Sequence, residues 1–429
     1  MIAFWLTLPL GLRFLLIGVI GLIGGGLANH IIYAFAYYNP RQISPWGPAP
    51  EDAPPRQLTD RIPVLGWFGL RRESPVHGNG FWIRPILIEL ATAIGLLLLY
   101  RFETSGGLLP LPLTFPAYIQ SYAATANQIF YSHLILMVLM MAATVIDFDE
   151  KIIPDVITIP GTIIALIIGA CTVFVFMPTG LPVGPNGAAE TVAPTTFDSP
   201  WFHRPNEWLG TPGLSAGLAI WTVWCFALCD RRWSGMVWRR RGLSRAIKHF
   251  VNGVFHYGFW KVLAAIWLIG VVGISWVWSL GGQHWLGLFT SLVGLAVGGG
   301  VIWAIRIIAA VALNKEAMGF GDVTLMAMIG AFLGWQAALI AFFLSPFTAI
   351  VIVLVRYIIT RDAYTPYGPY LCAGAVVTIV FWDGLYNNWL AFNLLVIGAM
   401  LMWLCVVMLV LMAVMLFVWR MIKERLFAE

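Results

Sequence analysis

Apolar runs of about 20 residues recur along the whole chain, and they limit more than any other feature what this sequence can fold into. Each run is long enough to cross the ~30 Å hydrocarbon core of a membrane as a helix. Of the 429 residues, only 10% are charged, whereas a soluble domain carries about a quarter. Backbone polar groups in lipid must be satisfied within the protein, and uninterrupted runs favour helices over the alternating strands of a barrel. The sequence predicts an all-α polytopic integral membrane protein.

About 11 of these runs are predicted to be transmembrane helices, and the basic residues predict their orientation. Nearly all of the 25 Lys and Arg residues fall in alternate connecting segments, which the positive-inside rule assigns to the cytoplasm. The amino terminus is therefore predicted to lie outside. The first run is interpreted as a retained span, because no basic segment precedes it. The predicted spans are residues 10–38, 84–101, 127–146, 155–178, 214–230, 259–279, 284–312, 322–334, 336–355, 367–383 and 389–420.

The charges and the cysteines argue against two classes of site. The net charge of +5 reflects the basic residues of the cytoplasmic loops, so it does not indicate a nucleic-acid partner. The five cysteines form no CxxC pair and lie apart from other metal-ligating side chains. We therefore predict no metal ligands and no nucleic acid, with membrane lipid as a partner of the apolar spans.

Two aspartates lie at the ends of predicted spans, where an ionisable side chain without a partner costs ~2–3 kcal/mol or more. Asp147 ends the third span and Asp322 begins the eighth, so the predicted topology puts both at the cytoplasmic face at about the same depth. Two neighbouring carboxylates share a proton, and the pair can act as base and acid. We predict that Asp147 and Asp322 activate a water molecule and polarise a scissile carbonyl.

Two glycines precede Asp322 in the stretch "MGFGDV". We expect Gly319 and Gly321 to permit irregular backbone and a close approach of substrate. The alternative for Asp322 is a helix cap, stabilised by exposed N–H groups.

Three further acids lie beside apolar runs. We interpret Asp149 as part of a solvated cytoplasmic turn and Asp155, which follows Pro154, as a helix cap. Glu89 lies inside a span, about one and a half turns past Arg84, and is expected to pair with a buried base or with a catalytic neighbour.

Several ordered motifs resemble those of the type IV prepilin peptidases, which are membrane aspartic proteases of the GxGD kind. The two strongest are "IDFDEKIIPD" (146–155) and "AMGFGDVTL" (317–325). Three others match the first span, the first cytoplasmic loop with the start of the second span, and a late motif. They are "GGGLANHIIY" (24–33), "RIPVLGWFGLRRES" (61–74) with "RPILIEL" (84–90), and "TPYGPYLCAGA" (365–375).

The resemblance implies an endopeptidase that cuts the basic leader from prepilins or pseudopilins at the cytoplasmic face of the inner membrane. The cut falls after a glycine, just before the hydrophobic helix of the pilin. Asp147 and Asp322 are then the catalytic pair, supported by Gly319, Gly321, Asp149, Asp155 and Glu89. Proteolysis implies no cofactor. Many members also methylate the new amino terminus with S-adenosylmethionine. The amino-terminal part that carries this activity diverges most here, so methylation stays open.

The chain departs from the family in its first loop and in its length. The family commonly has two zinc-binding CxxC pairs in that loop, and the stretch here has none. Residues 1–126 hold two spans and the loop, 39–83, and residues 127–178 hold the spans around the first catalytic aspartate. Residues 179–283 are interpreted as an insertion with an outer loop, two spans and a basic cytoplasmic segment. Residues 284–429 hold the GxGD and carboxy-terminal spans.

Three points stay open at this stage. The basic segment 231–250 suits an interfacial helix on anionic lipid or an ordinary connecting loop. A proton- or ion-coupled transporter would use Glu89, Asp147 and Asp322 as a relay, although the inverted repeat typical of many transporters is missing. A third alternative is a scaffold for pseudopilins that has lost its activity, against which the two intact aspartates argue.

Overall fold

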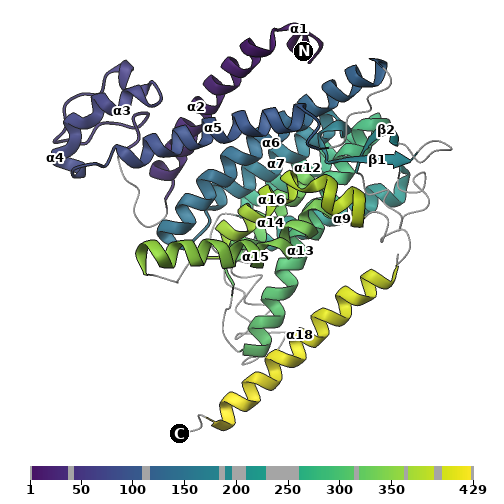
Figure 1. Cartoon of the computed structure of the whole chain (residues 1–429). Helices are drawn as coiled ribbons and strands as arrows, with labels where there is room; N and C mark the ends of the chain where they lie inside the picture. The colour runs from purple at the N-terminus through teal and green to yellow at the C-terminus, as the bar shows by residue number, and fades with distance from the viewer. Residues whose placement is uncertain are drawn as a thin grey trace. The chain divides into compact units, whose positions relative to one another are not determined.

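The computed structural model of the protein describes residues 2–36, 43–108, 116–182, 189–195, 209–228, 260–313, 318–361, 366–390 and 399–426. Nearly all regular structure within these residues is helical (Figure 1). The chain falls into two compact units, and each is described by itself. The predicted basic segment 231–250 lies outside the described residues.

The first unit comprises Met1–Ile164, Phe174–Pro194 and Ile340–Asp383. It contains the first part of α7 (Asp155–Cys171) and most of α15 (Trp335–Thr360). Its other elements are α1 (Ile2–Thr7), α2 (Leu10–Ala34), η1 (Leu58–Arg61), α3 (Leu65–Gly69), η2 (Leu70–Glu73), α4 (Ser74–His77), α5 (Ile83–Thr104), α6 (Pro116–Glu150), β1 (Pro178–Pro182), β2 (Ala189–Pro194) and α16 (Gly368–Val380).

The second unit comprises Ala165–Val173, Thr195–Leu339 and Gly384–Glu429. Its elements are α9 (Thr211–Leu228), α12 (Trp260–Leu280), α13 (Gly282–Leu313), α14 (Phe320–Leu333), the π-helix η4 (Asp383–Leu390) except for its first residue, and α18 (Ala399–Leu426).

Seven helices of the described part are long and apolar enough to cross a membrane, namely α2, α5, α6, α9, α12, α13 and α15. The helices α16 and η4, which meet at a bend of 68°, could together form an eighth span. The prediction of a helical, multi-pass membrane protein is therefore confirmed. Each predicted span overlaps a helix, but α7 and α14 have only 17 and 14 residues. The number of spans and the outside amino terminus stay predictions.

A small antiparallel hairpin, β1–β2, departs from the expectation of an all-α chain. It lies in the Pro- and Gly-rich segment that was predicted only as an outer loop. The hairpin belongs to the first unit. Its first residue is held there by Trp382, whose indole Nε1 donates a hydrogen bond of 2.7 Å to the carbonyl of Pro178. Main-chain pairing in this segment depends on neighbours along the hairpin, which apolar periodicity does not reveal.

In the first unit, α2 and α5 approach so closely that their backbones are in contact. A Cβ placed on Gly21 would lie 2.7 Å from the Cα of Ala93, and one on Gly25 would lie 2.6 Å from the Cα of Glu89. Small residues at such a crossing are typical of membrane helices, where packing replaces the hydrophobic effect. The close contact brings the glycine-rich motif of α2 beside Glu89. The short helices α3 and α4 lie beyond the amino-terminal end of α5 (Figure 1).

In the second unit, α13 and α14 form the corresponding glycine-mediated pair. Cβ atoms placed on Gly294 and Gly330 would each collide with the backbone of the other residue, and one on Gly298 would lie 2.5 Å from the carbonyl oxygen of Met326. The hydroxyl of Ser291 on α13 also donates to the carbonyl of Ala331 on α14. This packing buries every residue of α14 from Asp322 onward.

Candidate active site

Asp147 occupies the last turn of α6 and is only 3% exposed. The helix ends at Glu150, and Lys151 turns the chain with a positive φ of 59° while its N–H donates to the carbonyl of Asp147 at 2.9 Å. The carboxylate Oδ2 accepts a hydrogen bond of 3.1 Å from the backbone N–H of Gly368. This N–H belongs to the first residue of α16, at the end of a helix where free N–H groups favour an anion.

Gly368 belongs to the "TPYGPY" motif, and its contact with Asp147 explains why a glycine suits this position. A Cβ there would lie 2.5 Å from Asp147 Oδ2 and 2.8 Å from Cδ1 of Ile153. The flanking tyrosines are tied to α15: the hydroxyls of Tyr367 and Ser345 lie 2.6 Å apart, and the hydroxyl of Thr348 donates to the carbonyl of Tyr370 at 3.0 Å. The motif thus holds one backbone N–H against the carboxylate of Asp147.

For the leader cleavage that the motif resemblance implies, we expect Gly368→Ala to lower the rate by about 10²-fold, because the methyl group would displace the Asp147 carboxylate from its N–H donor. The measurement is kcat/KM for a prepilin peptide with the purified protein in lipid vesicles. Gly95→Ala on α5 is the control, since a Cβ there meets nothing within 4 Å. Cleavage by Gly368→Ala at the wild-type rate would show that this contact does not position Asp147.

Asp322 is the third residue of α14 and is 8% exposed. The residue before the helix, Gly319, has φ −70° and ψ 154°, an extended conformation that any residue can adopt. The expected irregular backbone is therefore not needed at Gly319, and Gly321 lies inside the first helical turn. Space does not require a glycine there either, because a Cβ on Gly319 would lie 3.6 Å from Asp322 Oδ2, an ordinary van der Waals contact.

Arg306 on α13 contacts the segment that leads into Asp322. The side chain is largely buried, its Nε donates to the carbonyl of Met318 at 3.3 Å, and its guanidinium lies 5.5 Å from the ring centroid of Phe320. A buried arginine at the end of a span is expensive without partners. From the sequence, Arg306 is one of the basic residues that indicate topology, and its place at the end of an apolar run was a usable signal for a buried role.

Asp147 belongs to the first unit and Asp322 to the second. Within the first unit the Asp147 carboxylate accepts the N–H of Gly368, and within the second unit Asp322 lies nearly buried in the first turn of α14. That the two form a catalytic pair remains a prediction from the sequence.

Glu89 is 2% exposed and joins three of the sequence motifs. It accepts hydrogen bonds from Asn29 Nδ2 at 3.1 Å, from Trp67 Nε1 at 2.8 Å and from the backbone N–H of Val64. All three donors are neutral, in place of the expected buried base. Val64 has φ 63° and ψ −55°, a strained turn for a β-branched residue. Glu89 therefore fixes the first loop against α2 and α5.

The two remaining acids lie in more exposed positions. Asp149 forms an ion pair of 2.8 Å with Arg84, and both side chains are 42% exposed. Such a pair contributes little to stability. Asp155 is the first residue of α7 and is half-buried.

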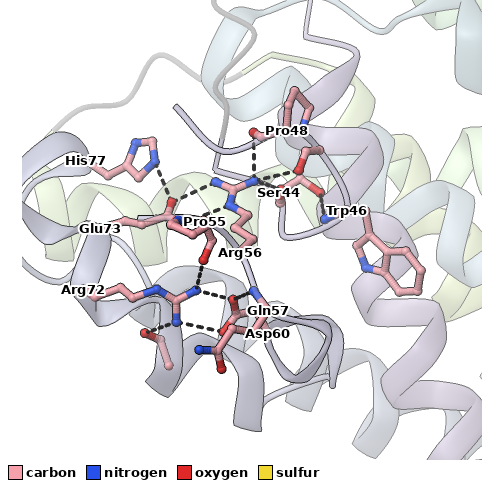
Figure 2. A network of polar contacts seen from close by, with 12 residues as sticks. Ser44, Trp46, Pro48, Pro55, Arg56, Gln57, Asp60, Arg72, Glu73 and His77 are labelled. Atoms are coloured by element: carbon pink, nitrogen blue, oxygen red, sulfur yellow. Dashed lines mark hydrogen bonds and ion pairs between the residues drawn. The ribbon is translucent and has the colours of Figure 1, made fainter. Parts of the chain in front are cut away.

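The first loop is held by a network of ion pairs (Figure 2). Arg56 donates to both carboxylate oxygens of Glu73, at 2.9 and 2.8 Å, and also to the carbonyl of Ser44. Nε2 of His77 lies 3.2 Å from the same carboxylate. Glu73 thus contacts both an arginine and a histidine. The described residues contain no group of three or more His, Cys, Asp or Glu that could hold a metal. These residues do not fit the zinc site of the family.

A second ion pair in the network joins Arg72 and Asp60, which contact each other through both carboxylate oxygens. Burial raises the pKa of Asp60, but hydrogen bonds from Arg72 and from the backbone N–H of Gln57 outweigh it, so the pKa lies below its ordinary value of 3.8. Asp60 is therefore ionised at neutral pH and completes the ion pair.

Comparisons with known proteins match parts of the chain. Residues 259–354 match the family model described as "Type IV leader peptidase family". The segment includes Asp322 and ends before the Gly368 motif. Relatives named "Prepilin leader peptidase/N-methyltransferase" include those of Pseudomonas putida (27% identical, covering 30% of this chain and 43% of the relative), Aeromonas hydrophila (34%, 26% and 40%) and Legionella pneumophila (37%, 18% and 27%).

The chain thus matches less than half the length of these curated relatives, and no solved structure matches it. The ordered motifs extend the likeness on both sides of the matched segment, to the first span and to the Gly368 region. The matched segments are thus similar to the type IV leader peptidase family.

Proposed function

We propose that this chain is a membrane endopeptidase that removes the leader of prepilins or pseudopilins at the cytoplasmic face of the inner membrane. The observation that carries the proposal is the setting of its GxGD aspartate. Asp322 is nearly buried at the start of α14, inside the segment that matches the leader peptidase family. Asp147, at the end of α6, supplies the second carboxylate of the proposed pair.

In this mechanism, one aspartate is ionised and the other is protonated. The ionised carboxylate takes a proton from a water molecule as the water oxygen bonds to the scissile carbonyl carbon, and the protonated aspartate gives its proton to the carbonyl oxygen. The tetrahedral intermediate then collapses, the C–N bond breaks, and the leaving nitrogen takes a proton from the pair. The N–H of Gly368 keeps Asp147 in place throughout. Which aspartate starts as the base is not assigned.

The predicted topology is part of the proposal. A chain with about 11 spans and its amino terminus outside puts the first loop, Asp147 and Asp322 on the cytoplasmic side, where a basic leader would meet them. The overlap of each predicted span with a helix supports this arrangement. Neither the family match nor the relatives support the alternative of a transporter, so it is not proposed.

Methylation of the new amino terminus is a separate proposal, supported by the names of the relatives. The described residues of the amino-terminal part do not identify a group that would hold S-adenosylmethionine.

The test uses the purified full chain in lipid vesicles and a synthetic prepilin peptide with its leader. We expect mass spectrometry to find a single cut after the glycine that precedes the hydrophobic segment. An intact peptide, with a protein whose circular dichroism shows a folded helical state, would refute the proposal. Labelled S-adenosylmethionine in the same reaction reports methylation independently, through transfer of label to the cut peptide.

A further inference from the structure

One face of α5 is exposed along the whole helix and is apolar. The exposed side chains follow each other at intervals of three and four residues, which places them on one face of a helix. They are Ile83 (47% exposed), Leu87 (60%), Leu90 (38%), Ile94 (54%) and Leu98 (63%). Because α5 is long and apolar enough to cross a membrane, this face is the one that contacts lipid.

A cluster of Phe68, Arg71 and Trp82 lies where this lipid-facing stripe begins. Trp82 directly precedes Ile83, the first residue of the stripe. The guanidinium carbon of Arg71 lies 3.9 Å from the ring centroid of Trp82 and 4.8 Å from that of Phe68, and the two rings are 5.6 Å apart. Phe68 and its α3 neighbour Leu65 are 47% and 67% exposed. The apolar surface of α5 thus continues onto α3 through a stacked arginine.

Arg71 differs from the three arginines around it that form ion pairs. Arg56, Arg72 and Arg84 each pair with a carboxylate. Arg71 is exposed and pairs with no acid in the described part of the chain, where its guanidinium contacts aromatic rings. Stacking on a ring holds a guanidinium flat and leaves its N–H edge open, and that edge matches the oxygens of a phosphate.

The position of the Phe68–Arg71–Trp82 cluster indicates that the phosphate is that of a lipid headgroup. A tryptophan and an arginine at the end of a membrane-spanning helix lie at the level of the lipid headgroups. We propose that the Phe68–Arg71–Trp82 cluster binds the phosphate of an anionic phospholipid, whose acyl chains then lie along the exposed face of α5. The lipid would fix the first loop, which Glu89 holds from its inner side through Trp67 and Val64. The proposal does not depend on the peptidase activity.

The test is a titration of the purified full chain in detergent with phosphatidylglycerol, followed by native mass spectrometry. Arg71→Gln is expected to weaken retention of the tightest phosphatidylglycerol about fivefold, from the ~1 kcal/mol that a basic residue contributes at an anionic surface. Arg71→Lys, which keeps the charge but loses the flat stack, should fall between Arg71→Gln and wild type. The matched control is Arg61→Gln, an exposed arginine of the same loop whose guanidinium lies farther, 5.8 Å, from a tryptophan ring centroid.

The outcomes distinguish a specific lipid site from diffuse attraction by the loop and from binding of free phosphate. Wild-type retention by Arg71→Gln would overturn the site, and an equal loss in Arg61→Gln would show diffuse attraction by the whole loop instead. Displacement of the lipid by millimolar inorganic phosphate would overturn a lipid occupant in favour of free phosphate. Equal thermal unfolding temperatures of the variants in lipid-free detergent exclude misfolding as the cause. Should Arg71→Gln unfold, Trp82→Leu removes the stacking surface instead and is expected to lose the same lipid.

Discussion

Asp147→Asn and Asp322→Asn are each expected to lower kcat/KM for leader cleavage by about 10²–10⁴-fold, the range over which a positioned acid or base contributes. Asparagine has the shape of aspartate, and its Oδ1 can still accept the N–H of Gly368, so the first substitution keeps the local structure. It removes the group that takes or gives a proton. The double variant should be no slower than the slower single variant, because two residues that act as a unit do not contribute additively.

Asp149→Asn is the matched control for both variants. It neutralises a carboxylate two residues from Asp147, but Asp149 is 42% exposed and pairs only with Arg84 among the salt bridges of the described residues. Its cleavage rate should stay within about twofold of wild type, because exposed ion pairs are weak. Near-normal cleavage by Asp147→Asn or Asp322→Asn would remove that residue from the catalytic pair. A loss confined to Asp322→Asn would leave a GxGD peptidase whose second acid is yet to be found.

The helices could be predicted from the sequence because each is encoded locally, by an apolar run. The ends of the helices were harder to predict, because an apolar run can continue beyond the last residue of its helix. The predicted span 10–38 continues past the end of α2 at Ala34, and the predicted span 155–178 includes the start of a β-strand at Pro178. Both runs stay apolar beyond the helix, so composition alone does not mark where backbone hydrogen bonding changes.

The contacts of the candidate site could not be predicted, because they join residues far apart in the chain. The motifs around Asp147 and Gly368 were both found, but the hydrogen bond between them spans 221 positions. Glu89 was singled out for the right reason, as a buried acid, yet its partners are an indole, an amide and a backbone N–H. A single sequence predicts that a buried charge needs partners, and only the fold identifies them.

Glu73→Ala is expected to destabilise the first loop by about 3–5 kcal/mol, the cost of leaving a buried charge without its partner. The side chains of Arg56 and Glu73 are 7% and 0% exposed, and Arg56 donates to both carboxylate oxygens. In the variant, the hydrogen bonds from Arg56 to the carbonyls of Ser44 and Gly47 remain, but they do not neutralise the charge of Arg56. The measurement is hydrogen–deuterium exchange of residues 43–82, where protection should fall by about 10²–10⁴-fold.

The ion pair of Arg84 and Asp149 offers a matched control, because it has the same length, 2.8 Å, but is 42% exposed at both ends. Asp149→Ala should cost at most about 1 kcal/mol. Replacing both partners of the buried pair, as in Arg56→Met with Glu73→Leu, should recover most of the loss, since apolar side chains of similar volume leave no charge to solvate. Equal exchange in Glu73→Ala and Asp149→Ala would contradict burial as the reason for the difference. Loss of protection on adding a chelator to the wild type would instead show that a metal stabilises the loop.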